Sequence, residues 1–537
     1  MPNKLFYGDN LAVLRESVHS ESVDLVYLDP PFNSNANYNV LFKAPSGEQS
    51  AAQIEAFEDT WHWNDSAEKA FDEVMTGPHS DAGTMIRAMR SALGENDLMA
   101  YLTMMAVRLT ELHRVLKRTG SLYLHCDPTA SHYLKMILDS IFGPQHFQNE
   151  IIWKRASAHN RAKRWGPVHD VILFYTKSDV HTWNRTFVEY GQEYLDSKYR
   201  HKDIQGRVYR LSDLTGPGTR AGDSGEEWRG VNPTKYGRHW EPPHDRALPS
   251  WFSHPAGWSE MSVRARLELM HEADLIQWPK KAEGRPEFRR YLEAALGSPI
   301  QDVISDIDPV NSMAQERLNY PTQKPVELLE RILTASSSKG ELVLDPFCGC
   351  GTAVHAAHKL DRNWIGIDVT HLAVALVERR LKAAFSGIVY EVHGVPRDHA
   401  GARDLAERDK HEFQKWITAT IGAQPYKGGK KGMDRGIDGY LHFRDADKKP
   451  QFAIVSVKGG GIKSGDVRDL KGVMEREKAA MGLFLSLNPP TREMERSGLS
   501  GFVRDWRAES SPASNPDSRP NPRWAKAAAP VWAFGRL

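Results

Sequence analysis

The sequence predicts an α/β protein with more than one domain, and three observations carry this prediction. Short apolar runs alternate with helical patterns over residues 1–154 and again over residues 301–395, as βα units do. A shorter and separate α/β pattern follows at residues 411–505. The length of 537 residues allows two to four domains, at roughly 100 to 200 residues for each.

Composition limits the class of protein before any motif is considered. The chain has 70 Lys+Arg and 69 Asp+Glu, so its formal net charge of +1 indicates no particular partner. Hydrophobic residues make up 40% and the mean hydropathy is −0.54, which suits buried cores. No apolar run approaches the roughly 18 residues of a membrane-spanning helix. The N-terminus lacks an apolar signal region and there are only three cysteines. We therefore expect a cytoplasmic protein with no membrane partner.

Residues 1–154 alternate between strands and helices. The expected elements are a strand at 5–7, a helix at 10–18, a strand at 23–28, a helix at 97–117, a strand at 121–125 and a helix at 133–141. The helix at 97–117 follows from apolar residues at a 3.6-residue period that Gly120 ends. Residues 33–95 are polar, contain several aromatic residues and are expected to form loops.

The periodicity fades from residue 155 to residue 300, apart from a strand at 171–175. Residues 151–240 hold 16 Lys+Arg and 10 Asp+Glu, and eight of the fifteen tryptophans lie between 151 and 300. Basic and aromatic residues interleaved on loops suit a nucleic-acid surface. A loop-rich subdomain whose tryptophans fill its core fits the same composition equally well.

The regular pattern resumes near residue 320. The expected elements are a helix from Pro325, a strand at 342–344, a helix at 352–360, a strand at 364–367 and a helix at 371–384. Residues 396–410 are predicted to be a linker, and strands are expected at 452–457 and 483–487. Residues 506–537, rich in Ser, Pro, Asn and Arg, are predicted to be a flexible tail.

A glycine-bearing loop follows the strand at 342–344. Gly349 and Gly351 lie between this strand and the next helix, where glycine lets the backbone approach a ligand closely. Asp368 ends the following strand, 17 residues after Gly351, and an acid at about this distance suits a ribose diol. The loop lacks the Lys-Ser/Thr of a P-loop, which disfavours triphosphate binding. Asp345 before the loop and Asp368 after it favour a nucleoside cofactor. Cys348 and Cys350 are interpreted as small packing residues.

The tetrapeptide Asp29-Pro30-Pro31-Phe32 ends the strand at 23–28. Two prolines fix φ and remove two amide donors, which makes the turn rigid. The carboxylate of Asp29 could accept a hydrogen bond from an exocyclic amine while the ring of Phe32 stacks on its base. The alternative is a proline-rigidified surface turn without a ligand.

Together the two motifs resemble those of the DNA amino-methyltransferases, which pair D/N/S-P-P-Y/F/W with F-x-G-x-G. Here they are residues 29–32 and 347–351, and this order is that of the β class. Residues 8–33, 149–153 and 320–325 are similar to modification subunits of type III restriction systems and their relatives. The resemblance covers residues 3–390. It implies a Rossmann-like methyltransferase fold, S-adenosylmethionine as cofactor and double-stranded DNA as partner.

The resemblance also implies site residues. The matched cofactor-binding residues are Asp9, Thr322, Lys324, Asp345, Pro346, Phe347, Gly349, Gly351, Thr352 and Asp368. Asp9 matches the acid near the adenine, Thr322 and Lys324 the motif that reaches the methionine end, and Asp368 stands where the family usually has Glu to hold the ribose. The catalytic residues are Asp29, Pro30, Pro31 and Phe32. Residues 155–300 take the place of a target-recognition insert, and the target base must be flipped out of the duplex. An Asp-first tetrapeptide favours N6 of adenine, with N4 of cytosine as the alternative.

Residues 411–505 resemble nucleases of the PD-(D/E)xK type related to the Mrr restriction enzyme. Asp438 and Lys458 match that motif, and Glu412 lies on the preceding helix. In the family an acid and a Glu or Gln two residues before the Lys hold a divalent metal such as Mg²⁺ that activates water, and the resemblance puts this acid at Asp438. Ser456 replaces the usual Glu or Gln. A restriction endonuclease fused to its own methyltransferase, as in restriction-modification or phage defence, and a DNA-binding module that does not cleave therefore both stay open, and a homodimer is compatible with either.

Overall fold

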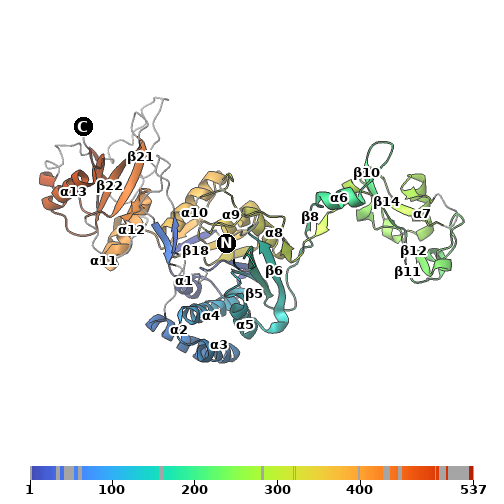
Figure 1. The fold of residues 1–537 in the computed structure, drawn as a ribbon, viewed down its shortest axis with the longest axis horizontal. Coiled ribbons are helices and arrows are strands. Elements are labelled where there is room, and N and C mark those ends of the chain that lie inside the picture. Colours follow the sequence, from blue (N-terminus) through green and yellow to red (C-terminus); the bar gives the residue numbers. More distant parts are fainter. Residues whose placement is uncertain are drawn as a thin grey trace. The chain divides into compact units, whose positions relative to one another are not determined.

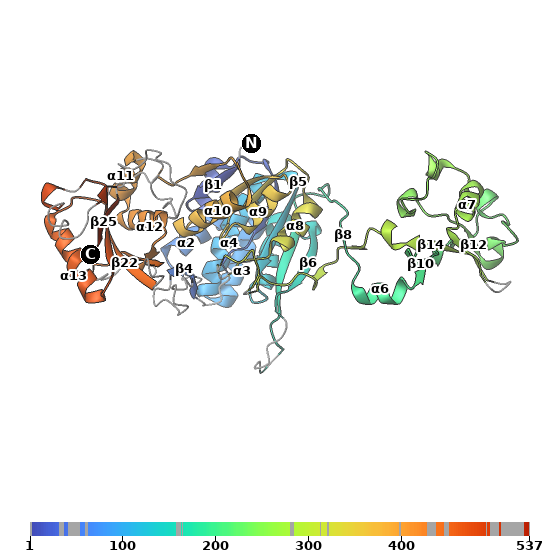
Figure 2. The same ribbon diagram turned by 90° about the horizontal axis from the view of Figure 1, so that it is seen from above.

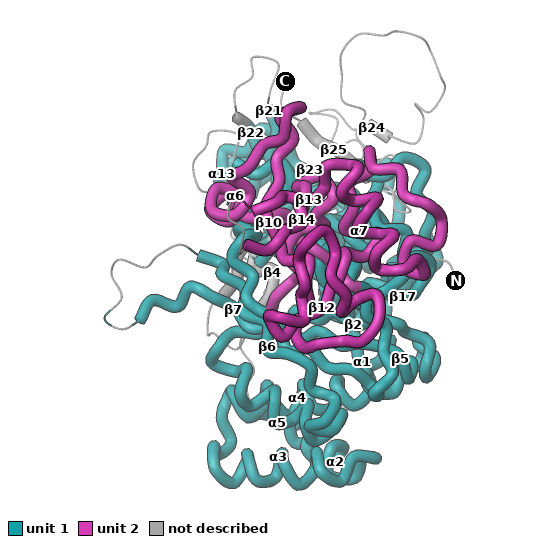
Figure 3. The backbone as a smooth tube through the Cα atoms, turned by 90° about the vertical axis from the view of Figure 1, so that its right-hand side faces the viewer, with its two compact units in different colours: residues 1–184, 302–537 teal, residues 185–301 magenta. Residues whose placement is uncertain are grey.

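The computed structural model of the chain describes residues 3–31, 37–40, 54–58, 63–156, 163, 165–279, 284–311, 313–318, 320, 322–396, 399–426, 436–444, 450–489, 491–494, 504–505 and 531–535. The chain forms two compact units, residues 1–184 with 302–537, and residues 185–301 (Figure 3).

The larger unit contains a nine-stranded sheet. Its strands, in spatial order, are β16 (Val303–Ile304), β6 (Phe147–Lys154), β7 (His169–Thr176), β5 (Leu116–Cys126), β2 (Val23–Leu28), β17 (Leu342–Asp345), β18 (Asn363–Asp368), β1 (Lys4–Tyr7) and β19 (Glu391–His393). Neighbours from β5 to β19 are parallel, whereas β7 is antiparallel to both β5 and β6. The α/β fold class is thereby confirmed, and the arrangement is Rossmann-like.

Helices cover both faces of this sheet (Figures 1 and 2). One face carries α1 (Asn10–Ser17), α2 (Asp65–Thr76), α3 (Ser80–Leu93), α4 (Asp97–Val115) and α5 (Ser131–Phe142). The other face carries α8 (Val326–Ser336), α9 (Thr352–Lys359) and α10 (His371–Ala384). Strand β2 is buried on both sides, with Val26 and Leu28 in the first core and Leu25 and Tyr27 in the second. This double burial explains its almost continuous apolar sequence.

The strand order brings distant parts of the sequence to one edge. Strand β17 lies between β2 and β18, with Val343 paired to Leu25 and Leu344 to Val26. The carboxyl ends of β1, β2, β17 and β18 therefore meet at a topological switch point, where the connections that follow adjacent strands run to opposite faces of the sheet. Open α/β sheets bind their ligands at such a point.

Two helices occupy a region that the sequence predicts as loops. Helices α2 and α3 lie within residues 33–95, and their inward side chains include Ala67, Ala70 and Ala82. Small inward residues give a weak apolar pattern, so the helical period is hard to recognise. Asn64 caps α2 by accepting hydrogen bonds from the amides of Ser66 and Ala67. A hairpin of β3 (Asn37–Val40) and β4 (Ile54–Glu58) precedes them.

The compact insert is shorter than the 155–300 that the sequence predicts. The strand expected at 171–175 is β7 of the main sheet, and the separate unit spans 185–301. Its elements are β8 (Phe187–Val188), α6 (Gln192–Lys198), β9 (His201–Lys202), β10 (Val208–Asp213), β11 (Thr215–Pro217), β12 (Arg238–Trp240), α7 (Val263–Glu272), β13 (Ile276–Gln277), β14 (Glu287–Tyr291) and β15 (Ser298–Pro299). A four-stranded sheet in the order β13-β14-β10-β9 supports this unit.

Tryptophans form much of the core of residues 185–301. Trp228, Trp240 and Trp258 are at most 2% exposed and pack together with Leu267 and Met270. Each indole N–H donates to an acceptor inside the unit, namely Glu268 Oε1, the Glu226 carbonyl and the Pro243 carbonyl. For these three residues the core interpretation is confirmed over base stacking.

The C-terminal region builds a second sheet in the order β20-β21-β22-β23-β25-β24. Its elements are α11 (His399–Arg408), α12 (Lys410–Thr420), β20 (Gln424–Pro425), β21 (Gly439–Arg444), β22 (Pro450–Lys458), α13 (Ser464–Glu477), β23 (Met481–Ser486), β24 (Arg504–Asp505) and β25 (Val531–Gly535). The structure differs from two of the sequence-based predictions for this region. Helix α11 occupies the predicted linker at 396–410 because Ala402 and Leu405 pack into the core of this domain. Strand β25, in the predicted tail at 506–537, pairs with β23.

Among the described residues, no helix combines the length and apolar character needed to cross a membrane.

Candidate functional site

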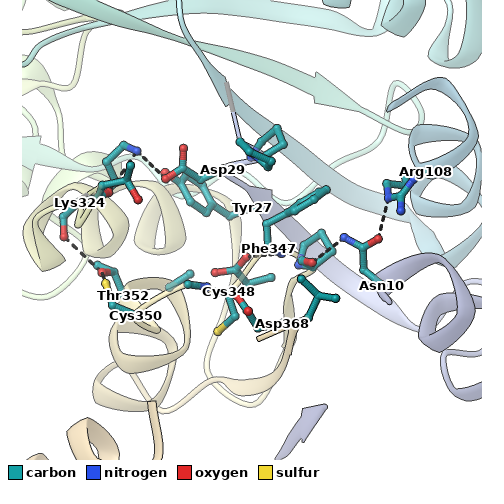
Figure 4. Close-up of a pocket in the computed structure, with 18 of the residues that line it drawn as sticks. Asn10, Tyr27, Asp29, Arg108, Lys324, Phe347, Cys348, Cys350, Thr352 and Asp368 are labelled. Atoms are coloured by element: carbon teal, nitrogen blue, oxygen red, sulfur yellow. Dashed lines mark hydrogen bonds and ion pairs between the residues drawn. The ribbon is translucent and has the colours of Figure 1, made fainter. Parts of the chain in front are cut away.

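A cavity of about 320 Å³ opens at the carboxyl ends of β1, β2, β17 and β18 (Figure 4). Most residues that the sequence predicts for the site line it: Asp9, Asp29, Pro30, Pro31, Thr322, Lys324, Asp345, Pro346, Phe347, Gly349, Thr352 and Asp368. Phe32 lies outside the described residues, and Gly351 is not among the lining residues. The structure thus brings the Asp-Pro-Pro turn and the glycine loop into one pocket.

The turn after β2 is held by an ion pair. The Lys324 ammonium donates to Asp29 Oδ2 at 2.5 Å, and the two side chains are 9% and 18% exposed. Lys324 precedes α8, so this pair joins segments 295 residues apart in sequence. Asp29 therefore enters the pocket with one of its carboxylate oxygens already engaged.

The glycine loop is fixed between β17 and β18. Gly349 N donates to Asp368 Oδ2 at 2.8 Å, and Cys348 N donates to the Ile367 carbonyl at 2.9 Å. Gly349 and Gly351 have φ of +50° and +76°, a region that favours glycine. A Cβ on Gly349 would stand 3.3 Å from the ring of Tyr320, at the surface of the cavity. The bare backbone at this position leaves room for a ligand.

Arg108 organises the opposite wall, a role that the sequence reading missed. Its guanidinium donates to Asn10 Oδ1 at 2.7 Å and to Asp9 Oδ2 at 2.9 Å. Asn10 Nδ2 in turn donates to the Pro346 carbonyl at 2.9 Å. Asp9 also caps α1 through the amides of Leu11 and Ala12. The sequence holds one indication of this role: Arg108 lies on the apolar face of the helix at 97–117, where a buried charge needs a partner.

Arg380 braces the far end of the glycine loop. Its guanidinium donates to the Cys350 carbonyl and to Thr352 Oγ1, each at 3.0 Å. Cys348 and Cys350 are about 5% exposed, and burial raises the pKa of both thiols. Within the described ranges no three His, Cys, Asp or Glu side chains gather as metal ligands would.

The electrostatics of the pocket favour a cation. Four acids, Asp9, Asp29, Asp345 and Asp368, line it against two cationic side chains, Lys324 and Arg108. Burial raises the pKa of Asp345 well above its usual range despite a hydrogen bond from Phe347 N, and the charges of Asp29 and Asp368 raise it further. Burial also raises the pKa of Asp368. A positively charged ligand with hydroxyl donors would relieve this crowding.

The residues expected of a nuclease are only partly together. Asp438 accepts hydrogen bonds from Val457 N at 2.6 Å and Gln414 Nε2 at 3.0 Å. Lys458 Nζ lies 3.8 Å from Asp466 Oδ1. Glu412 instead accepts a hydrogen bond from the Tyr7 hydroxyl at the end of β1 and one from Lys415. The contact with Tyr7 joins helix α12 to the methyltransferase sheet, and the contact with Lys415 lies within α12.

A Rossmann-like sheet that holds a glycine loop, a strand-end acid and a rigid Asp-Pro-Pro turn in one cavity defines an S-adenosylmethionine-dependent methyltransferase. The chain belongs to the N6/N4 DNA methylase family, whose model, described as DNA methylase, matches residues 23–379. The C-terminal domain lies beyond this match.

Three relatives illustrate the similarity. The type II methyltransferase M.EcaI of Enterobacter cloacae is 28% identical over 382 residues, which cover 71% of this chain and 69% of that protein. The StyLTI Mod subunit of a type III restriction-modification enzyme of Salmonella typhimurium is 24% identical, over 67% of this chain and 50% of its own length. The DNA adenine methyltransferase YhdJ of Escherichia coli is 22% identical, over 76% of this chain and 91% of its own length.

The raised pKa of Asp345 has a consequence for stability. A carboxyl whose folded pKa lies above its unfolded value of 3.8 contributes stability that is complete below pH 3.8 and lost as pH rises through the folded pKa. Asp345→Asn, which keeps the acceptor for Phe347 N, should therefore gain stability relative to the parent as pH rises above 3.8. Urea unfolding at several pH values measures this difference. The exposed Asp361→Asn control should follow the parent, and an equal slope for Asp345→Asn and the parent would contradict the assignment.

Proposed function

We propose that this DNA methyltransferase transfers the methyl group of S-adenosylmethionine to the exocyclic N6 amine of a flipped adenine. The observation that carries the proposal is the single cavity shared by Asp29 and the glycine loop. When bound, the cofactor supplies an electrophilic methyl group on a sulfonium. The bare backbone at Gly349 and the crowded carboxylates of Asp345 and Asp368 fit a cationic nucleoside of this kind.

Each residue of the catalytic turn and of the cofactor site has its own proposed role. Asp29 accepts a hydrogen bond from the target amine through the oxygen that Lys324 leaves free. Pro30 and Pro31 hold this carboxylate at the pocket rim, and Phe32 stacks on the flipped base. Asp368 receives the ribose through Oδ2, which accepts from Gly349 N and keeps a second lone pair, whereas Oδ1 accepts from both the amide and the hydroxyl of Thr370. Thr322 and Lys324 lie at the methionine end, and Asp9 at the adenine end.

Adenine is favoured over cytosine for two reasons. The tetrapeptide begins with Asp, which in this family accompanies N6-adenine transfer more often than N4-cytosine transfer. The similar protein YhdJ also carries the name DNA adenine methyltransferase. The type II and type III relatives support a place in restriction-modification.

Removing the Asp29 carboxylate should stop transfer and spare cofactor binding. We expect Asp29→Ala to lower the single-turnover rate at least about 100-fold. Affinity for S-adenosylhomocysteine should change by less than about threefold in calorimetry. The matched control is Asp127→Ala, at another strand-end Asp-Pro turn, and Asp127 is not one of the lining residues. Nucleoside mass spectrometry of DNA treated with the parent should show N6-methyladenine; N4-methylcytosine alone would contradict the adenine proposal, and a parallel loss of affinity would contradict the role of Asp29.

We also propose that DNA is recognised by two parts of the predicted insert at 155–300. Residues 185–301 contain 18 Lys+Arg and 17 Asp+Glu, so the unit has almost no net charge. The basic excess lies instead at residues 151–184, with six Lys+Arg and two Asp+Glu. These residues include the β6–β7 connection, which leaves the sheet beside the carboxyl end of β5 because Cys126 pairs with Val171. The connection would grip phosphate, and the unit at 185–301 would read the target sequence.

Neutralising the β6–β7 connection should weaken DNA binding in a salt-dependent way. A variant with Arg161→Gln, Lys163→Gln and Arg164→Gln should reduce the slope of log affinity against log salt by about 2 to 3, because each phosphate contact contributes about 0.9. Fluorescence anisotropy over a salt series measures this slope.

The control for this variant changes three lysines on connections and helix ends at the opposite edge of the sheet: Lys339→Gln, Lys359→Gln and Lys382→Gln. Its slope should equal that of the parent. An unchanged slope in the Arg161, Lys163 and Arg164 variant would place the phosphate contacts elsewhere.

For the C-terminal domain we propose a nuclease-like fold that binds DNA without cleaving it. Three features support a non-cleaving module over an active, Mg²⁺-dependent endonuclease. Ser456 is a neutral residue at a ligand position, both Asp438 oxygens accept hydrogen bonds from the domain, and Glu412 faces Tyr7.

Cleavage assays separate the two hypotheses. Unmethylated plasmid incubated with the purified protein and Mg²⁺ or Mn²⁺ should stay intact, while Lys458→Ala should lower DNA affinity several-fold without changing methylation. Metal-dependent cleavage by the parent that Asp438→Ala removes would establish an endonuclease instead.

A further inference from the structure

A chain of buried polar side chains runs from the wall of the cavity into the protein. Tyr27 Oη lies 2.9 Å from His125 Nδ1, and His125 Nε2 lies 3.2 Å from Asp170 Oδ2. Asp170 Oδ1 forms an ion pair with Arg155 Nε at 2.7 Å. The first three residues lie on the adjacent strands β2, β5 and β7, and each is at most 3% exposed. Only Tyr27 lines the cavity.

The side chains around Tyr27, His125 and Asp170 are mostly apolar. Tyr27 belongs to the same core as Leu25, Phe174 and Trp153. The rings of Trp153 and His125 are packed edge to face, with their centroids 5.8 Å apart. Burying a hydroxyl, an imidazole and a carboxylate here is costly unless each is satisfied. A leucine or phenylalanine at position 125 would fill such a site at lower cost, so packing alone does not account for these residues.

The hydrogen bonds fix where the protons lie. Burial lowers the pKa of His125, the charge of Lys324 lowers it further, and Asp29 and Asp170 oppose these effects. The ring is therefore neutral and carries one N–H. Burial alone would raise the pKa of Asp170, but His125 and the charges of Lys324 and Arg155 outweigh it and lower that pKa, so Asp170 acts only as an acceptor. His125 Nε2 then donates to Asp170, and His125 Nδ1 accepts the hydroxyl proton of Tyr27.

This arrangement gives the Tyr27 oxygen free lone pairs at the cavity wall. Tyr27 and Asp29 stand two residues apart at the end of β2, and both line the cavity. Burial raises the pKa of Tyr27, and the charge of Asp29 raises it further. One Asp29 oxygen is engaged by Lys324. The pocket therefore offers the target amine a second acceptor backed by a histidine and a carboxylate, the same order of groups that activates serine in hydrolases.

We propose that Tyr27, His125 and Asp170 form a relay that takes up the proton lost by the target amine, an inference that rests on the proposed transfer to an exocyclic amine. As the nitrogen lone pair forms the new C–N bond, the C–S bond breaks and its electrons remain on sulfur. The nitrogen then carries one surplus proton. This proton passes to Tyr27 Oη while the hydroxyl proton of Tyr27 passes to His125 Nδ1.

The relay ends with a neutral phenol and an imidazolium beside the Asp170 carboxylate. Asp170 and Arg155 stabilise and orient His125 without contacting the reacting atoms, so they are positioning residues. The reverse transfer, from His125 through Tyr27 to water in the emptied pocket, returns the relay to its starting state.

The chain offers a matched control on the neighbouring strand. Tyr123 is paired with Tyr27 across β2 and β5, is equally buried, and its hydroxyl lies 2.5 Å from Ser336 Oγ. Tyr123 does not line the cavity. Tyr123→Phe therefore removes a buried hydroxyl from the same core without touching the proposed relay.

The test uses the full-length protein and an adenine-containing duplex. Tyr27→Phe and His125→Asn should lower the single-turnover transfer rate by about 100-fold, the usual scale of general acid–base assistance. Affinity for S-adenosylhomocysteine should stay within about twofold of the parent in calorimetry, and Tyr123→Phe should keep the parent rate. The parent rate should fall at acid pH, since a protonated His125 cannot accept the Tyr27 proton. This acid limb should be absent in His125→Asn.

Two results would overturn the relay. One is a Tyr27→Phe variant that transfers at the parent rate, or that loses no more than Tyr123→Phe. The other is an acid limb that persists in His125→Asn. If His125→Asn does not fold, Tyr27→Phe with parent-like cofactor affinity decides alone. Failure of the proposed function is distinguishable, because the parent itself would then yield no N6-methyladenine.

Discussion

The pairing of β17 between β2 and β18 is the constraint on which the site depends. It places Asp29, Asp345 and Asp368 at one edge, although they come from opposite ends of the methyltransferase sequence. Asp24 secures this pairing at the other edge, because its carboxylate accepts from Leu342 N at 2.9 Å and from Lys117 Nζ at 2.7 Å. A slip of one residue along β2 would turn Tyr27 and Asp29 to the other face of the sheet. The buried carboxylate of Asp24 thus helps to hold the strand register that keeps Tyr27 and Asp29 on the side of the cavity.

The second constraint on the pocket is the close placement of several acidic side chains. Three carboxylates approach one another, and only Lys324 supplies a positive charge among the lining residues near Asp29. Such a site costs stability in the absence of ligand, because buried carboxyls repel one another and are poorly solvated. The sulfonium and ammonium groups of the proposed cofactor would offset that cost on binding. Preorganised acceptors therefore serve both cofactor affinity and the handling of the amine proton.

The sequence predicted strand β2, the glycine loop, helix α10 and most of the cavity lining, since these depend on local patterns and short motifs. It did not predict helices α2 and α3, whose inward residues include alanines. It also missed Arg108 and the His125–Asp170 pair, because a buried polar contact between segments far apart in the sequence leaves no periodic signal. For helix α11 and strand β25, the polar composition predicts a linker and a tail, whereas α11 packs into the core of its domain and β25 pairs with β23.

The most direct test of the account is a crystal structure of the protein with S-adenosylhomocysteine. The account predicts that the ligand fills the cavity at the carboxyl ends of β2, β17 and β18, with its ribose at Asp368 and its sulfur facing Asp29 and Tyr27. Because the sulfur marks where the methyl group would leave, this one geometry tests cofactor loop, catalytic turn and relay together. A ligand bound elsewhere, or one whose sulfur points away from Asp29, would contradict the shared-pocket mechanism.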